Sequence, residues 1–411
     1  MDIRREHPES LSEFEHAPAR HVRAWSLAFL VFWLLLAGWD WAARFALFRW
    51  QDLLWTRPAP PPAQVQQAAA EATSRVVPAQ AGAGLARMVP VPWIASRYKE
   101  VHPEYVEYRD AWGYANPPPP ADGYYPVVMT GDSFMLSLGT QNVAQVLAEL
   151  GRIPVYNHAR QGSGPLLEIQ RFIFSTRFDP PPKVVVWNLL GRELGAPLFL
   201  RQPVEAWFAK INVWDSYIQK EERGGLRWRQ LATGRLSRDW PDTSVIAYLC
   251  RRGWGLAELA VFREWPRDVL GAEDPQFGPM LFYRENLRVL PTLAPGENSP
   301  GVVKTVARIA RGLKERGTTL VVLLVPEKEQ VHYQALSPAD RQALASGPQL
   351  FADIETGLEQ EGVPVVNLWP VFRQATAAGQ RLYWRDDTHW NDAGIRLAAE
   401  ELWRVVEPLL K

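Results

Sequence analysis

The chain contains very little cysteine, with Cys250 as the single thiol among 411 residues. One cysteine excludes an internal disulfide and a metal site built from cysteine pairs. The seven histidines are scattered, no glycine-rich phosphate loop leads into a predicted helix, and no internal repeat is visible. Because metal and nucleotide sites need such clusters or loops, we expect neither a metal nor an organic cofactor.

Excess charge is also absent. Lys and Arg together number 45, as do Asp and Glu, so the formal net charge at pH 7 is zero. Nucleic-acid-binding domains carry a basic excess, so nothing here favours a nucleic acid partner. The length allows one or two domains with a large core. Function must therefore be read from motifs.

The N-terminal region divides sharply in character. Residues 1–23 are polar and charged, whereas residues 24–45 are predominantly apolar and have the length that crosses a ~30 Å hydrocarbon core. Trp25, Trp39 and Trp41 stand where interfacial tryptophans are expected. The pattern predicts a transmembrane helix preceded by a cytoplasmic tail. A cleaved signal peptide and a buried soluble helix are the alternatives.

Residues 46–121 are predicted to connect this helix to the domain that follows. Arg57 to Gly84 is rich in Pro, Ala and Gln, which is typical of a semi-rigid stalk. Met88 to Tyr125 lacks periodicity, so we expect an irregular lead-in there.

Strand and helix patterns alternate over residues 122–411. Short apolar runs predict five strands, at residues 126–129, 153–156, 184–190, 319–325 and 365–368. Strands separated by helices indicate an α/β fold with a parallel five-stranded sheet and helices on both faces. Ligands of such sheets bind at the carboxyl ends of the strands.

Ser133 follows the first of these strands. Gly131 and Asp132 provide turn chemistry, and a helical pattern runs from Leu136 to Leu150. The hydroxyl would thus lie at the carboxyl edge of the sheet, with its N–H at a helix N-terminus that favours developing negative charge. Capping that helix is the commoner role for a serine in this position.

A second motif, Asp386-Asp387-Thr388-His389, precedes the last predicted helix. Either Asp387 or Asp386 could orient the imidazole of His389 as the third member of a triad with Ser133. Alternatively, the acidic pair caps a helix starting near Asn391, with His389 as an exposed loop residue.

With its Gly131–Phe134 (Gly-Asp-Ser-Phe) and Asp387–Trp390 (Asp-Thr-His-Trp) motifs, the chain resembles the SGNH (GDSL-type) hydrolase superfamily over roughly residues 122–411. Within it, the resemblance is to the alginate O-acetyltransferase group (AlgX/AlgJ-like). This implies the SGNH three-layer fold, with Ser133 as nucleophile, His389 as base and Asp387 as its orienter. In the alginate enzymes the Asp-x-His motif precedes the serine, whereas here it follows, as in ordinary SGNH hydrolases.

The resemblance also implies an oxyanion hole. Gly162 occupies the position of the glycine whose N–H helps to form it, although a plain turn former would also be a glycine. Arg192 stands where the family has an asparagine donor. Either Arg192 or Asn188 could point a donor at the oxyanion, or neither does.

Residues 195–300 interrupt the sheet pattern, and we expect a helical insertion that could form a lid. Its aromatic side chains could bind sugar rings or form the lid's own core, which is the commoner role. They include Trp207, Phe208, Trp214, Tyr217, Trp228, Trp240, Trp254 and Trp265. His332, after the fourth strand, is a candidate for the substrate edge or simply a surface residue.

The resemblance implies a function that the residues alone do not give. It is a membrane-anchored, extracytoplasmic O-acetyltransferase that transfers an acetyl group through an acyl-Ser133 intermediate to hydroxyls of an exopolysaccharide. A membrane-bound O-acyltransferase would deliver the acetyl group, and the chain would cross the bacterial inner membrane once, with its catalytic domain in the periplasm. The alternatives are a membrane-anchored carbohydrate acetylesterase and a non-catalytic glycan-binding scaffold.

Overall fold

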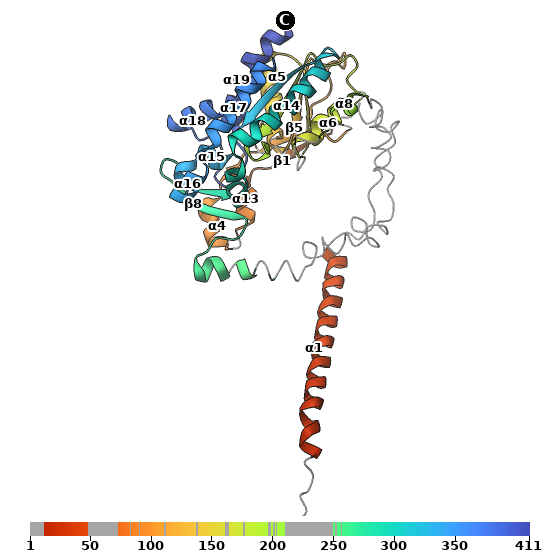
Figure 1. Cartoon of the computed structure of the whole chain (residues 1–411), viewed down its shortest axis with the longest axis vertical. Helices are drawn as coiled ribbons and strands as arrows, with labels where there is room; N and C mark the ends of the chain where they lie inside the picture. The colour runs from red at the N-terminus through yellow and green to blue at the C-terminus, as the bar shows by residue number, and fades with distance from the viewer. Residues whose placement is uncertain are drawn as a thin grey trace, which may run out of the picture. The chain divides into compact units, whose positions relative to one another are not determined.

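The computed structural model describes residues 12–47, 73–209 and 250–411, apart from gaps of one to three residues within these ranges (Figure 1). The chain divides into two compact units, one comprising residues 1–59 and 222–254 and the other residues 60–221 and 255–411. The sheet and the candidate site belong to the second unit.

Helix α1 (Ser12–Leu47) belongs to the first unit and includes the predicted transmembrane segment. Its apolar side chains are largely exposed, with Trp25 at 76% and Leu35 at 69%. In the described part of the chain, no helix combines the length and apolar character required to cross a membrane. The predicted membrane-spanning helix is therefore not confirmed.

A five-stranded, wholly parallel sheet forms the centre of the second unit (Figure 1). Its strand order is β11-β10-β7-β5-β6. The strands are β5 (Val127–Gly131), β6 (Val155–Ala159), β7 (Val184–Leu190), β10 (Thr319–Val325) and β11 (Val365–Asn367). This confirms the predicted α/β fold with a five-stranded parallel sheet.

Successive residues of a strand point to opposite faces of the sheet. Both faces of this sheet therefore present apolar side chains, and helices cover both of them. In β7, Val184 and Val186 face one core and Val185 and Trp187 face the other. The first core is closed by α5 (Val143–Gly151), α18 (Leu368–Ala377) and α19 (Asp392–Leu410). The second core is closed by α6 (Pro165–Phe174), α14 (Pro295–Lys314) and α17 (Gly347–Gln360).

Regular elements begin at Thr73 and include residues 92–98, 101–102 and 105–109 of the predicted irregular lead-in, so that expectation is wrong there. Residues 57–72 of the predicted stalk lie outside the described residues. Strand β1 (Thr73–Val77) pairs with β4 (Tyr105–Arg109), and β2 (Gln80–Ala81) pairs with β3 (Val101–His102). Between them lie the 3-10 helix η1 (Gly84–Arg87) and α4 (Pro92–Tyr98). These elements are too short to show periodicity. Residues 85–98 gain stability from a small third core that they share with Leu259, Val269 and Leu281 of the later insertion.

The insertion at residues 195–300 is not purely helical. It includes α8 (Val204–Ala209), the π-helical turn η4 (Glu258–Phe262), α13 (Arg284–Val289), η5 (Leu290–Thr292) and the start of α14. It also contains an antiparallel hairpin of β8 (Val269–Asp274) and β9 (Gly278–Tyr283), which the sequence analysis missed. The hairpin was missed because Pro279 and two glycines, Gly271 and Gly278, interrupt the alternation of its strands.

The described tryptophans of the insertion differ in exposure. Trp207 is buried in the core beneath α14, and Trp265 packs edge-on against Tyr98 with 5.5 Å between ring centroids. Trp254 is exposed. Trp214, Tyr217, Trp228 and Trp240 lie outside the described residues. Trp207 and Trp265 thus contribute to cores.

Short helical turns complete the fold at the carboxyl edge of the sheet and beyond it. They are η2 (Ser133–Met135), η3 (Gly191–Glu193), α15 (Lys328–Val331), η6 (Tyr333–Ala335) and α16 (Pro338–Ala343).

Candidate active site

The turn after β5 presents the hydroxyl of Ser133. Asp132 is the N-cap of η2, and its side chain accepts a hydrogen bond from the backbone N–H of Phe134 at 3.0 Å. Capping a helix was the alternative role predicted for Ser133, but the residue that caps this turn is Asp132. The predicted helix from Leu136 begins only at Val143, where Asn142 forms a capping box.

Ser133 and His389 are in direct contact although 256 positions separate them. The Oγ of Ser133 lies 2.8 Å from Nε2 of His389, and Nδ1 of His389 lies 2.5 Å from Oδ1 of Asp387. The same Oδ1 accepts the backbone N–H of His389 at 2.9 Å. These distances suit a nucleophile, a base and a carboxylate that orients the base.

The charge of Asp387 sets the tautomer of His389. Burial alone would raise the pKa of Asp387, but the hydrogen bonds and charge of His389 outweigh it and hold the pKa below 3.8. Asp387 is therefore ionised at neutral pH and accepts the Nδ1–H of the imidazole. Nε2 is then the acceptor that faces the hydroxyl of Ser133.

Asp386, the alternative orienter, is bound elsewhere. Its Oδ1 lies 2.8 Å from Nε2 of His102, and its Oδ2 accepts the backbone N–H of Glu100 at 3.0 Å. Both partners belong to the N-terminal lead-in, and Asp386 is fully buried between them. The adjacent aspartates thus have different partners: Asp387 binds His389, and Asp386 binds His102 and Glu100 of the lead-in.

The two sequence motifs also contact each other beyond this chain of hydrogen bonds. The indole Nε1 of Trp390 donates to the carbonyl of Phe134 at 2.8 Å, and the ring of Phe134 lies 4.8 Å from that of His389. Asn391 caps α19 by accepting the N–H groups of Ala393 and Gly394. Asn391 therefore performs the capping that had been the alternative role of the acidic pair.

The side chains of Asn188 and Arg192 converge on Asp132. Asn188 donates through Nδ2 to Oδ1 of Asp132 at 3.1 Å and accepts its backbone N–H at 3.3 Å. Arg192 donates through Nη2 to Oδ2 of the same carboxylate at 3.4 Å. Both residues thus support the serine turn. Gly162 lies outside the described residues.

Gly131, directly before this turn, is required by its contact with Asn188. A Cβ on Gly131 would lie 1.3 Å from the amide oxygen of Asn188. The close approach lets the asparagine reach Asp132.

His332 was predicted as a substrate-edge or surface residue. It is 1% exposed, with Nδ1 3.1 Å from Oδ2 of Asp274, so the surface assignment is wrong. Burial lowers its pKa more than Asp274 raises it, so the imidazole is neutral at pH 7.

Glu327 and Lys328 at the carboxyl end of β10 are two buried charged residues that the sequence pattern did not predict. Glu327 binds Arg192 through both carboxylate oxygens at 2.9 Å, and Lys328 donates to carbonyl groups of the loop that carries Asp387. Charges directly after a buried strand, at the edge where ligands bind, were the signal that could have revealed them.

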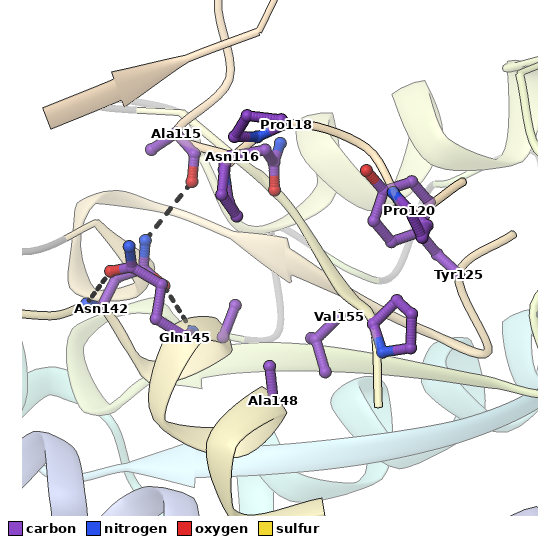
Figure 2. A pocket seen from close by; sticks show the side chains of 12 residues that line it. Ala115, Asn116, Pro118, Pro120, Tyr125, Asn142, Gln145, Ala148 and Val155 are labelled. Carbon is purple, nitrogen blue, oxygen red and sulfur yellow. Dashed lines mark hydrogen bonds between the residues drawn. The ribbon is translucent and has the colours of Figure 1, made fainter. Parts of the chain in front are cut away.

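A cavity of about 230 Å³ opens between α5 and the proline-rich segment before β5 (Figure 2). Its polar walls are bonded among themselves, since Asn142 contacts Gln145 and the carbonyl of Ala115. Ser133, His389 and Asp387 are not among its lining residues. We therefore assign the candidate site to the hydrogen-bonded serine and histidine.

Comparison with known proteins gives one family match and two relatives of low identity. Residues 281–411 match the family model of the SGNH hydrolase-like domain of the acetyltransferase AlgX. Two curated relatives carry the name alginate O-acetylase AlgJ. The one from Pseudomonas fluorescens is 23% identical over 44% of this chain and 43% of its own length, and the one from Azotobacter vinelandii is 24% identical over 38% of each. The chain thus spans less than half the length of the curated relatives it matches.

Solved structures that are similar share little sequence. A catalytic mutant of an acetylxylan esterase from Geobacillus stearothermophilus is 12% identical, with a TM-score of 0.34, over 68% of this chain and 93% of that one. A lipase/acylhydrolase from Enterococcus faecalis is 9% identical, with a TM-score of 0.33, over 69% of this chain and 96% of that one. The family match at residues 281–411 and the curated relatives confirm the resemblance of this chain to the SGNH AlgX/AlgJ-like group.

Proposed function

We propose that the chain is an SGNH-type O-acetyltransferase that moves an acetyl group through Ser133 to a hydroxyl of a polysaccharide. The observation that carries the proposal is the hydrogen-bonded series of Ser133, His389 and Asp387. The AlgX and AlgJ matches support acetyl as the group that is transferred.

In the first half-reaction His389 acts as the base. Its Nε2 takes the proton of Ser133 Oγ while Oγ bonds to the carbonyl carbon of the acetyl donor. When the tetrahedral intermediate collapses, the bond to the leaving group breaks and the leaving group takes the proton from His389. The product is acetyl-Ser133. Asp387 stabilises the imidazolium while it carries the proton.

In the second half-reaction a sugar hydroxyl replaces the leaving group. His389 takes its proton, the sugar oxygen attacks the acetyl carbon, and Ser133 Oγ leaves and recovers the proton. The backbone N–H groups of Ser133 and Gly162 would hold the oxyanion in both steps, and one such donor is typically worth about 3 kcal/mol of barrier.

A carbohydrate acetylesterase is the second candidate. One observation favours it: Ser133 precedes the Asp387–His389 motif in the chain, which is the order of ordinary SGNH hydrolases. In that case water replaces the sugar hydroxyl in the second step, with the same residues in the same roles. Transfer requires that water be kept from the acetyl-enzyme.

The setting of the reaction is part of the proposal. The exposed apolar side chains of α1 would anchor the chain in the bacterial inner membrane, with the catalytic domain in the periplasm. A polysaccharide would be the acceptor, and a membrane-bound O-acyltransferase would deliver the acetyl group. The names of the alginate O-acetylase relatives support only the choice of a polysaccharide as the acceptor.

Incubation of the full chain with an acetyl ester, with and without an oligosaccharide acceptor, tests the proposal. We expect acetylated sugar and, by mass spectrometry, an acetyl adduct on Ser133 that is lost in Ser133→Ala. Acetate released at the same rate with and without acceptor, with no acetylated sugar, would establish the esterase. Unchanged polymer acetylation in cells carrying Ser133→Ala would leave only a non-catalytic scaffold.

A further inference from the structure

Glu327 and Lys328 are adjacent, charged and fully buried at the end of β10. Burial of a charged side chain is rare unless it is paired and bonded. Neither residue belongs to the series of Ser133, His389 and Asp387. Their bonding partners show what they hold.

Lys328 binds the loop that carries the acid and the base. Its Nζ donates to the carbonyl oxygens of Trp384 at 2.5 Å, Arg385 at 3.0 Å and Asp387 at 2.9 Å. An ammonium group has three N–H donors, so all three are used on this loop. The ring of Phe282 lies 5.3 Å from Nζ and covers the charge on another side.

Glu327 reaches the other half of the site. Its carboxylate binds Arg192, Arg192 binds the carboxylate of Asp132, and Asp132 caps the turn that presents Ser133. Two successive residues therefore hold the serine turn and the histidine loop against the same end of β10. That end is rigid because β10 lies between β7 and β11 in the sheet.

We propose that Lys328 is a positioning residue for the acyl transfer: by binding three carbonyl groups of the loop at Trp384–Asp387, it keeps His389 within hydrogen-bonding distance of Ser133. The proposal rests on the proposed function, because it concerns the efficiency of that reaction. Displacement of a catalytic group by about 1 Å can cost about 100-fold in rate.

The charge state of Lys328 gives the proposal a distinctive readout. Burial lowers its pKa to about 8, although Glu329 beside it, Asp387 and Asp386 on the loop, and Glu100 on the lead-in all favour the charged form. A neutral amine has two N–H donors and would leave one of the three carbonyls unpaired. Activity should therefore fall reversibly as pH rises through about 8.

The experiment measures kcat and KM of the full chain with an acetyl ester from about pH 6 to about 9.5. Lys328→Met removes the charge and keeps much of the side-chain volume. Lys328→Arg keeps a cation with several N–H donors. Lys314→Met is the control, because it makes the same Lys-to-Met substitution at an exposed position. We expect Lys328→Met to lower kcat by about 10- to 100-fold with little change in KM, and to lose the alkaline limb near pH 8. Lys328→Arg should restore part of kcat without that limb, and Lys314→Met should match the wild type.

Two controls keep the conclusion specific. Burial raises the pKa of Glu193 to about 8, so Glu193 titrates in the same pH range as Lys328. Any effect of Glu193 on the pH profile should remain in every Lys328 variant, which separates it from the effect of Lys328. If Lys328→Met does not fold, Lys328→Arg decides, because a guanidinium does not titrate below pH 12. A folded Lys328→Met variant with wild-type kcat, or a folded Lys328→Met or Lys328→Arg variant that keeps the full alkaline limb, overturns the proposal. Activity retained in Ser133→Ala would instead refute the proposed function itself.

Discussion

Gly84 lies directly against the carboxylate of Asp387. A Cβ on Gly84 would come within 1.5 Å of Oδ2 of Asp387, and the glycine has a positive φ of 41°. The segment that carries Gly84 is therefore a wall of the candidate site. Activity should therefore depend on a segment that lies 303 positions before Asp387 in the chain.

Gly84→Ala should lower kcat by about 100-fold, because the methyl group must displace the carboxylate that orients His389. Part of any loss of stability, about 1–2 kcal/mol, will come from the positive φ alone. Gly123→Ala is the matched control, because Gly123 has a φ of 69° and open space around its Cβ position. Acetyl-ester turnover and the thermal midpoint of both variants provide the measurement. Equal activities would show that the contact with Asp387 is unimportant.

The neighbouring aspartates should respond differently to the same substitution. Asp387→Ala is expected to lower kcat by about a thousandfold or more, because His389 loses the partner that fixes its tautomer. Asp386→Ala should chiefly reduce the free energy of unfolding, by about 3 kcal/mol, because it leaves the buried His102 without its carboxylate.

Chemical denaturation and steady-state kinetics on the two aspartate variants separate these effects. The folded Asp386→Ala protein should keep kcat within about tenfold of the wild type. A greater loss of kcat at Asp386 than at Asp387 would reassign the orienting role.

The parts of the site that the sequence predicted are those encoded locally. Ser133 follows a continuous apolar strand, and Asp387 lies two positions before His389, so short-range patterns are enough to identify them. The five strands were predictable because they are short, mostly apolar and largely buried, although β6 also contains Asn157 and His158 and β11 is only partly buried. Helix starts were less predictable: the helical pattern at Leu136 gives way to a 3-10 turn, and α5 begins only after the cap at Asn142.

The parts that were missed depend on contacts between distant segments. Gly84, Glu100 and His102 have no local pattern, and their roles arise from contact with the loop at Asp386 and Asp387. Arg192 was predicted as a possible oxyanion donor, but its contacts with Asp132, after β5, and Glu327, after β10, could not be read from the local sequence. Motifs identify the candidate reacting groups, whereas the residues that position them can be found only in the fold.

Stability should decrease as pH rises from about 5 to about 7. Burial raises the pKa of Glu327 from 4.5 to about 7, and the guanidinium of Arg192 offsets this only in part. In that window the unfolded chain has released the proton and the native state still holds it, so raising the pH favours unfolding. At about 1.4 kcal/mol per pH unit, the total effect is about 3 kcal/mol.

Glu327→Gln tests this linkage, because glutamine does not titrate. The variant should be less stable above about pH 7, where Glu327 is ionised and Arg192 loses its ionic partner, and its free energy of unfolding should vary less between pH 5 and 7. Glu193 and Glu329, whose pKa values burial also raises, titrate in both proteins. Denaturant titrations at several pH values give the slopes, and parallel slopes would rule out Glu327 as the titrating group.

Asn188→Ala distinguishes a support for the serine turn from an oxyanion donor. The amide of Asn188 bonds the side chain and the backbone N–H of Asp132, and the asparagine is 1% exposed. Its removal leaves a buried N–H and a carboxylate oxygen short of partners, at a cost of about 1–3 kcal/mol in the free energy of unfolding. Removal of an oxyanion donor instead lowers kcat by about 10²–10³-fold. We expect the thermal midpoint to fall and kcat to change by less than about tenfold. A large loss of kcat at an unchanged midpoint would make Asn188 the donor, and Asp132 would then require another support.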